Sequence, residues 1–102
     1  MNNFDEKIER FAEMVENQTK ERYLQQGYTV CVEHGNHKTS IKPGKKYTKV
    51  DVYTSGKYMV VNETGEIFGI KAYGVIHRGH YYGTLDEIED WYWGDYTAYP
   101  KN

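Results

Sequence analysis

The sequence predicts a single α+β domain: an N-terminal helix, a mainly antiparallel sheet of about four strands and a short C-terminal helix around one core. Three observations support this fold class. Apolar residues recur at helical spacing near the N-terminus. Alternating segments joined by short turn-like stretches occupy the middle of the 102-residue chain, and a helix-start motif follows them. Short connections favour antiparallel strands, because parallel strands need a long crossover.

The first helix is predicted over residues 1–27. Gly27 is typical of the residue that ends a helix. Residues at helical spacing form one apolar stripe: Phe4, Ile8, Phe11 and Val15. The stripe predicts that this helix packs on a sheet or on its own copy, which leaves a monomer and a homodimer both open.

The sheet and a glycine-rich loop are predicted over residues 28–83. Alternation of apolar and polar residues indicates strands, because successive side chains of a strand point to opposite faces. Four segments alternate in this way: residues 28–34, 47–53, 57–61 and 66–73. Pro43-Gly44 and the lysines around it predict an exposed loop at residues 38–46. After residue 73 glycines interrupt the alternation, which predicts a loop that carries His77-Arg78-Gly79-His80.

A short helix is predicted over residues 84–94. Thr84 and Glu87 have the spacing of a capping box, and the apolar residues Leu85 and Ile88 follow at helical intervals. Gly94 ends the pattern, and residues 95–102 are predicted to form a partly disordered tail.

Composition excludes several classes of protein. The net charge of −2 gives no overall attraction to nucleic acid, although residues 38–49 contain five lysines and no acid, and residues 86–95 contain five acids and no base. One cysteine, Cys31, allows no internal disulfide and is typical of a reducing cytoplasm. No apolar run is long enough to cross a membrane, so no membrane partner is expected. Eleven tyrosines predict a binding surface as well as an aromatic core.

One long motif resembles a known family. The run YMVVNETGEIFGIKAYG at residues 58–74, continued by HRGH at 77–80 and YGTLD at 82–86, is similar to a family of small bacteriophage and prophage proteins. The similarity extends over roughly residues 50–94. It implies no particular reaction or ligand. It implies a phage accessory protein that acts in the cytoplasm of a bacterial host and binds, inhibits or redirects a host component.

The histidines suggest metal or acid–base chemistry only by residue type. They form two His-x-x-His pairs, His34 with His37 and His77 with His80. Imidazole binds zinc, but the Cys-x-x-Cys framing common in structural zinc sites is missing, so no metal or cofactor is expected. Two histidines beside Arg78 would also suit a phosphodiesterase. Since no nucleophile–base or paired-carboxylate arrangement accompanies them, a binding protein is predicted rather than an enzyme.

Two binding hypotheses remain. In the first, a host bacterial protein binds the HRGH loop and the aromatic C-terminal region, since three consecutive rings at residues 91–93 cannot share one helix face. Its predicted contacts are Lys71, Tyr73, His77, Arg78, His80, Tyr81, Tyr82, Trp91 and Trp93. In the second, Arg78, the histidines and the lysine loop bind nucleic acid, a nucleotide or phosphate. Whether the C-terminal rings belong to the core or to an interface stays open.

Overall fold

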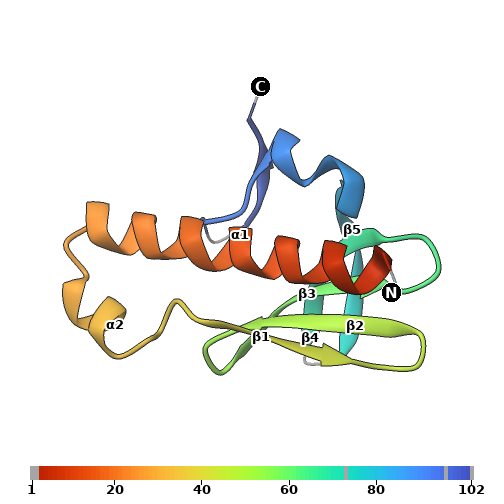
Figure 1. Cartoon of the computed structure of the whole chain (residues 1–102), viewed down its shortest axis with the longest axis horizontal. Helices are drawn as coiled ribbons and strands as arrows, with labels where there is room; N and C mark the ends of the chain where they lie inside the picture. Colours follow the sequence, from red (N-terminus) through yellow and green to blue (C-terminus); the bar gives the residue numbers. More distant parts are fainter. Residues whose placement is uncertain (1–2, 73, 96, 102) are drawn as a thin grey trace.

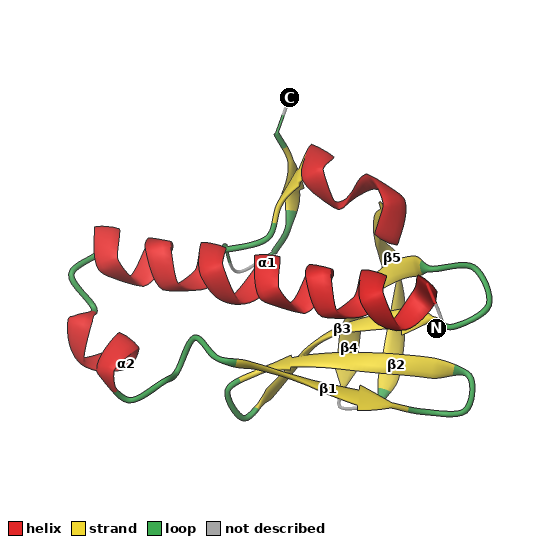
Figure 2. Ribbon diagram, viewed as in Figure 1, coloured by secondary structure: helices red, strands yellow, loops and turns green. Residues whose placement is uncertain are grey.

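The computed structural model of the protein describes residues 3–72, 74–95 and 97–101. The predicted α+β class is confirmed. A long helix, α1 (Asn3–Gln25), lies across one face of a five-stranded antiparallel sheet, and a two-stranded sheet lies near the C-terminus (Figure 1). Figure 2 shows the short helix α2 beside the C-terminal end of α1. None of the helices in the described ranges is both long and apolar enough to span a bilayer.

Helix α1 packs on the sheet through the predicted stripe. Ile8, Phe11 and Val15 are buried against strand residues such as Val50 and Ile67, while Phe4 is partly buried at the edge of the same cluster. The chain leaves α1 through Gly27, whose φ of +80° suits glycine because it lacks a Cβ. The prediction that this helix packs on a sheet is confirmed.

The strand predicted at residues 28–34 is wrong, because this segment forms α2 (Thr29–Glu33). Its alternation does not mark a buried face, since Val30 is 58% exposed. Local hydrogen bonds hold the turn instead, including one of 3.0 Å from the amide of His34 to the carbonyl of Val30. A short segment that buries little apolar surface gains little packing energy from an extended conformation.

The loop predicted at residues 38–46 is wrong over most of its length, because β1 (Thr39–Pro43) pairs with β2 (Tyr47–Val52). At its start, the Thr39 amide donates to the carboxylate of Glu16 on α1 at 3.0 Å. Lysine and proline are common on edge strands, where they discourage pairing with other chains. Only residues 44–46 form the turn.

The remaining strands follow as an antiparallel meander in the order β1-β2-β3-β4-β5, as the short connections predicted. The sheet therefore has five strands rather than about four. The other strands are β3 (Ser55–Val61), β4 (Glu66–Ala72) and β5 (Val75–Thr84).

The HRGH segment is part of β5, so the prediction of a loop there is wrong. Phe68 pairs with Tyr81, and the next residue of β4, Gly69, pairs with His77. Residues 78–80 of β5 therefore have no opposite residue on β4 and form a bulge. Such a bulge breaks the alternation of a strand without ending it, which explains the irregular sequence pattern.

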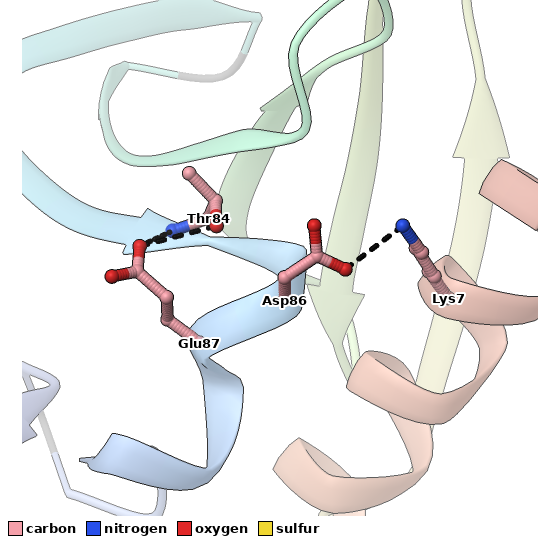
Figure 3. A network of polar contacts seen from close by, with 4 residues as sticks. All are labelled: Lys7, Thr84, Asp86 and Glu87. Carbon is pink, nitrogen blue, oxygen red and sulfur yellow. Dashed lines mark hydrogen bonds and ion pairs between the residues drawn. The ribbon is translucent and has the colours of Figure 1, made fainter.

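The predicted C-terminal helix is present only as the 3₁₀-helix η1 (Leu85–Asp90). Its capping box is confirmed, with the Glu87 carboxylate 3.1 Å from the amide and the hydroxyl of Thr84. A bridge of 2.8 Å between Lys7 and Asp86 joins η1 to α1 (Figure 3). Beyond η1, β6 (Trp91–Tyr92) pairs with β7 (Tyr99–Pro100), so part of the predicted tail is ordered.

Aromatic rings fill the core between α1 and the sheet. Tyr58 and Trp93 contact each other and both Phe11 and Tyr82 edge to face, with ring centroids 4.7–6.0 Å apart. Trp93 is 0% exposed, and its indole N–H donates to the carbonyl of Ile88 at 2.8 Å. The C-terminal rings are thus divided: Trp93 belongs to the core, while Trp91 is half-buried beside it.

Candidate functional site

The β5 bulge separates two predicted site residues, Arg78 and His80, that lie only two positions apart in the sequence. Arg78 lies over the ring of Phe68, with its guanidinium carbon 5.6 Å from the ring centroid, and donates a hydrogen bond of 3.2 Å to the hydroxyl of Tyr47. The imidazole rings of His80 and His77 stack with their centroids 4.0 Å apart, and His80 lines a cleft on the side of the sheet that carries α1. The HRGH segment therefore does not form one continuous binding loop.

Arg78 lies on the sheet face opposite α1, which we call the outer face. The pairing register aligns one row of directly opposite residues across all five strands of this face: Lys42, Lys49, Met59, Phe68 and Tyr81. Each neighbours a residue that points to the core, such as Val50 or Tyr58, so alternation places this row on the other side. The row is basic at β1 and β2 and aromatic at β4 and β5.

Further cations and rings border the basic end of this row. The Lys46 ammonium lies 5.6 Å from the ring centroid of Tyr47, the tyrosine that Arg78 also contacts. Lys42 bridges the buried carboxylate of Asp51 at 3.1 Å while its own side chain stays half exposed. Lysines distant from Arg78 in the sequence thus meet it on one surface, because the meander brings β2 and β5 to the same face.

The aromatic end of the row is partly open to solvent. Phe68 is buried beneath Arg78, and Tyr81 packs against Phe68 at 5.3 Å with 45% of its surface exposed. Burial raises the pKa of Tyr81, and the carboxylates of Glu66 and Glu87 raise it further. Tyr81 is therefore a neutral ring at physiological pH, and these two acids mark the limit of the basic surface.

The nine residues predicted as one site do not form one surface. Arg78 and Tyr81 share the outer face. Tyr82 and Trp93 lie in the core, where they cannot contact a partner without unfolding. Lys71 is exposed near the end of β4, and Tyr73 lies outside the described residues.

Sequence reasoning missed several residues of the outer face, chiefly Tyr47, Phe68 and Lys49. Alternation within each strand did indicate which residues share a face. The lysines of residues 38–46 were assigned to a loop, however, so they could not be placed in register with the aromatic residues of β4 and β5.

Neither histidine pair forms a metal site among residues 3–72, 74–95 and 97–101, where no three His, Cys, Asp or Glu side chains lie close enough together to hold an ion. In the first pair, His37 is buried while its predicted companion His34 is exposed. Comparisons with models of known protein families, with curated proteins and with solved structures gave no match.

The outer face combines two kinds of group that act together on nucleic acids. Lysine and arginine side chains neutralise phosphates, and flat rings stack on bases that are not already stacked in a duplex. A row across five strands, with neighbouring strands about 4.8 Å apart, spans roughly 19 Å. That length is enough for a few nucleotides of an extended strand.

Proposed function

We propose that the protein binds single-stranded nucleic acid through the outer face. The observation that carries this proposal is the register of the sheet, which aligns Lys42 and Lys49 with Phe68 and Tyr81 in one row. Arg78 supports it from β5, since its guanidinium reaches the same surface and contacts Tyr47. Phosphates would lie over the cations, and a base would stack on the exposed ring of Tyr81.

A single strand fits this surface better than a duplex. The cations and rings lie on the open face of a sheet rather than on a protruding helix or ribbon that could enter a groove. Tyr81 can stack only on a base whose face is free, which a duplex does not offer. The net charge of −2 is compatible with this proposal because the basic groups are gathered on one face.

The rival proposal is a host bacterial protein as partner. Its apolar part was expected to include Tyr82, Trp91 and Trp93, and the burial of Tyr82 and Trp93 removes two of these three rings from that surface. The resemblance of residues 50–94 to phage and prophage proteins supports a bacterial cytoplasm as the place of action. It agrees equally with a host nucleic acid and a host protein as target.

Replacing Tyr81 with alanine tests the aromatic part of the proposal. Tyr81→Ala is expected to weaken binding of a short fluorescent single-stranded oligonucleotide by about 1–3 kcal/mol, because one stacking platform is lost. Fluorescence anisotropy measures the affinity.

Tyr99→Ala is the matched control, since Tyr99 is 47% exposed, as Tyr81 is 45%, but lies on β7 away from the outer face. It should bind the oligonucleotide as the unchanged protein does. Equal losses in both variants would contradict the proposal. Capture of a stoichiometric host protein that survives nuclease treatment, with no oligonucleotide binding, would favour the rival proposal.

A further inference from the structure

A second candidate site lies on the opposite side of the sheet, where α1 packs. It is a cleft of about 550 Å³ between the C-terminal half of α1, the turn from β2 to β3, and strands β4 and β5. Pockets of this volume accommodate small molecules rather than polymers. The side chains relevant to a ligand are Arg22, Tyr23, Tyr53, Lys57 and His80, whereas Tyr58 and Tyr82, which also line the cleft, are buried.

A second bulge directs Lys57 into this cleft. Val50 pairs with Tyr58, and the next residue of β2, Asp51, pairs with Gly56, so Lys57 is the extra residue of β3. A bulge can re-aim a side chain that regular alternation would send to the other face. Lys57 accordingly lines the cleft together with Tyr58, and its ammonium donates to the carbonyl of Asp95 at 3.1 Å.

Arg22 of α1 brings a second cation to the same cleft. Its Nε donates to the carbonyl of Gly94, its Nη1 donates to the side chain of Gln26 at 3.3 Å, and its guanidinium lies 5.2 Å from the ring centroid of Tyr23. Burial lowers the pKa of Lys57, Arg22 lowers it further, and Asp95 acts in the opposite direction. The cleft therefore holds cationic charge that an anion would stabilise.

Tyr53 adds an aromatic ring at the rim of the cleft. It occupies the two-residue turn between β2 and β3 with a φ of +56°, which non-glycine residues seldom adopt. Its side chain is 57% exposed, so burial does not offset this strain. A two-residue hairpin turn needs a positive φ at this position and favours glycine, asparagine or aspartate there, so a tyrosine is an unusual choice.

We infer that this cleft binds a small organic anion that carries a planar ring, of the chemistry and size of a nucleoside monophosphate. The phosphate lies between Arg22 and Lys57, and the ring lies against the exposed Tyr53 at the mouth. Arginine suits this role because its guanidinium binds phosphate in a bidentate manner. The inference does not depend on the proposed function, which uses the other face of the sheet.

Titration of the isotope-labelled protein with AMP, followed by amide chemical shifts, tests this inference. AMP should shift residues 53–58 and 80–82 saturably and leave the amides of β1 unchanged. Adenosine and inorganic phosphate, titrated separately, should each bind at least tenfold more weakly than AMP, since each lacks one half of the recognised chemistry.

Two variants complete the test. Lys57→Met should weaken AMP binding at least tenfold, while Lys71→Met, which removes the same charge outside the cleft, should not weaken it. Tyr53→Gly should weaken binding several-fold and keep the fold, because glycine adopts a positive φ without strain. Shifts confined to the outer face, adenosine binding as tightly as AMP, or undiminished binding by Lys57→Met and Tyr53→Gly would each overturn the inference.

Discussion

At the residue scale, the buried Tyr58 is expected to make the stability of the folded protein depend on pH in alkaline solution. Its ring is 1% exposed and contacts Phe11, Tyr82 and Trp93, and its hydroxyl donates to the carbonyl of Trp93 at 3.4 Å. Burial raises the pKa of Tyr58 far above its ordinary value, and Tyr82 adds to this effect. The folded protein thus holds a phenol that ionises much more readily in the unfolded chain.

The free energy of unfolding is therefore expected to fall as the pH rises above about 10, the ordinary pKa of tyrosine. Above that pH the unfolded chain loses the Tyr58 proton while the folded protein keeps it, so the loss approaches about 1.4 kcal/mol per pH unit. The lowered pKa of Lys57 has the opposite effect, because it makes the free energy of unfolding rise with pH. This effect is confined to pH values below about 10.5, the pKa of lysine in the unfolded chain.

Urea denaturation at about pH 8 and at two values above about pH 10.5, which is beyond the lysine range, measures this slope. Tyr58→Phe keeps the ring and removes the ionisable group, so its stability should fall less steeply over the same range. Equal slopes for the two proteins would show that Tyr58 does not control stability in alkali.

At the element scale, the chain after β6 is held against α1 by backbone contacts. The Trp93 amide donates to the side chain of Gln18 at 2.6 Å, and Arg22 donates to the carbonyl of Gly94. This close approach needs a glycine. A Cβ at position 94 would lie 2.6 Å from the carbonyl oxygen of Gln18 and 2.5 Å from the hydroxyl of Tyr92.

Gly94→Ala is expected to lower the free energy of unfolding by about 1–3 kcal/mol, the usual cost of forcing an extra methyl group into a packed contact. Thermal or urea denaturation measures the change. Thr97→Ala, in an exposed position of the same connection, is the control and should change stability by less than about 0.5 kcal/mol. A Gly94→Ala protein as stable as the control would mean that this segment is not docked as described.

The helices and strands also show how much of the fold could be predicted from the sequence. Local patterns were informative: the α1 stripe, three of the strands and the Thr84–Glu87 capping box were predicted correctly. The errors fall at α2, β1 and β5, where the backbone depends on partners that are distant in the sequence. An edge strand rich in lysine resembles a loop, and a strand with a three-residue bulge has no regular period.

The candidate site could be predicted only in part, because its residues come from strands that are distant in the sequence. Arg78 and Tyr81 were singled out from residue type, and the lysine segment was named as an alternative contact. Their grouping depends on strand order and register, which bring β2 and β5 to one surface. Tyr82 and Trp93 were included because tyrosine and tryptophan serve cores and interfaces equally well, and composition does not separate the two uses.

At the scale of the whole molecule, the two proposed sites lie on opposite faces of the sheet. Helix α1 covers one side of the sheet, where the cleft lies, and none of the described helices packs across the other side (Figure 1). The cations of the outer face act locally, because the whole chain carries a net charge of −2. Affinity for a single strand should therefore depend on where positive charge is placed rather than on how much of it the protein carries.

The most direct test of the central claim is the salt dependence of oligonucleotide binding in two charge-matched double variants. Lys46→Met with Arg78→Met removes two positive charges from the outer face, and Lys20→Met with Lys71→Met removes two elsewhere. The first should flatten the plot of log affinity against log salt by about 0.7 per lost phosphate contact, and the second should leave it unchanged. Equal slopes in the two variants would contradict binding through the outer face.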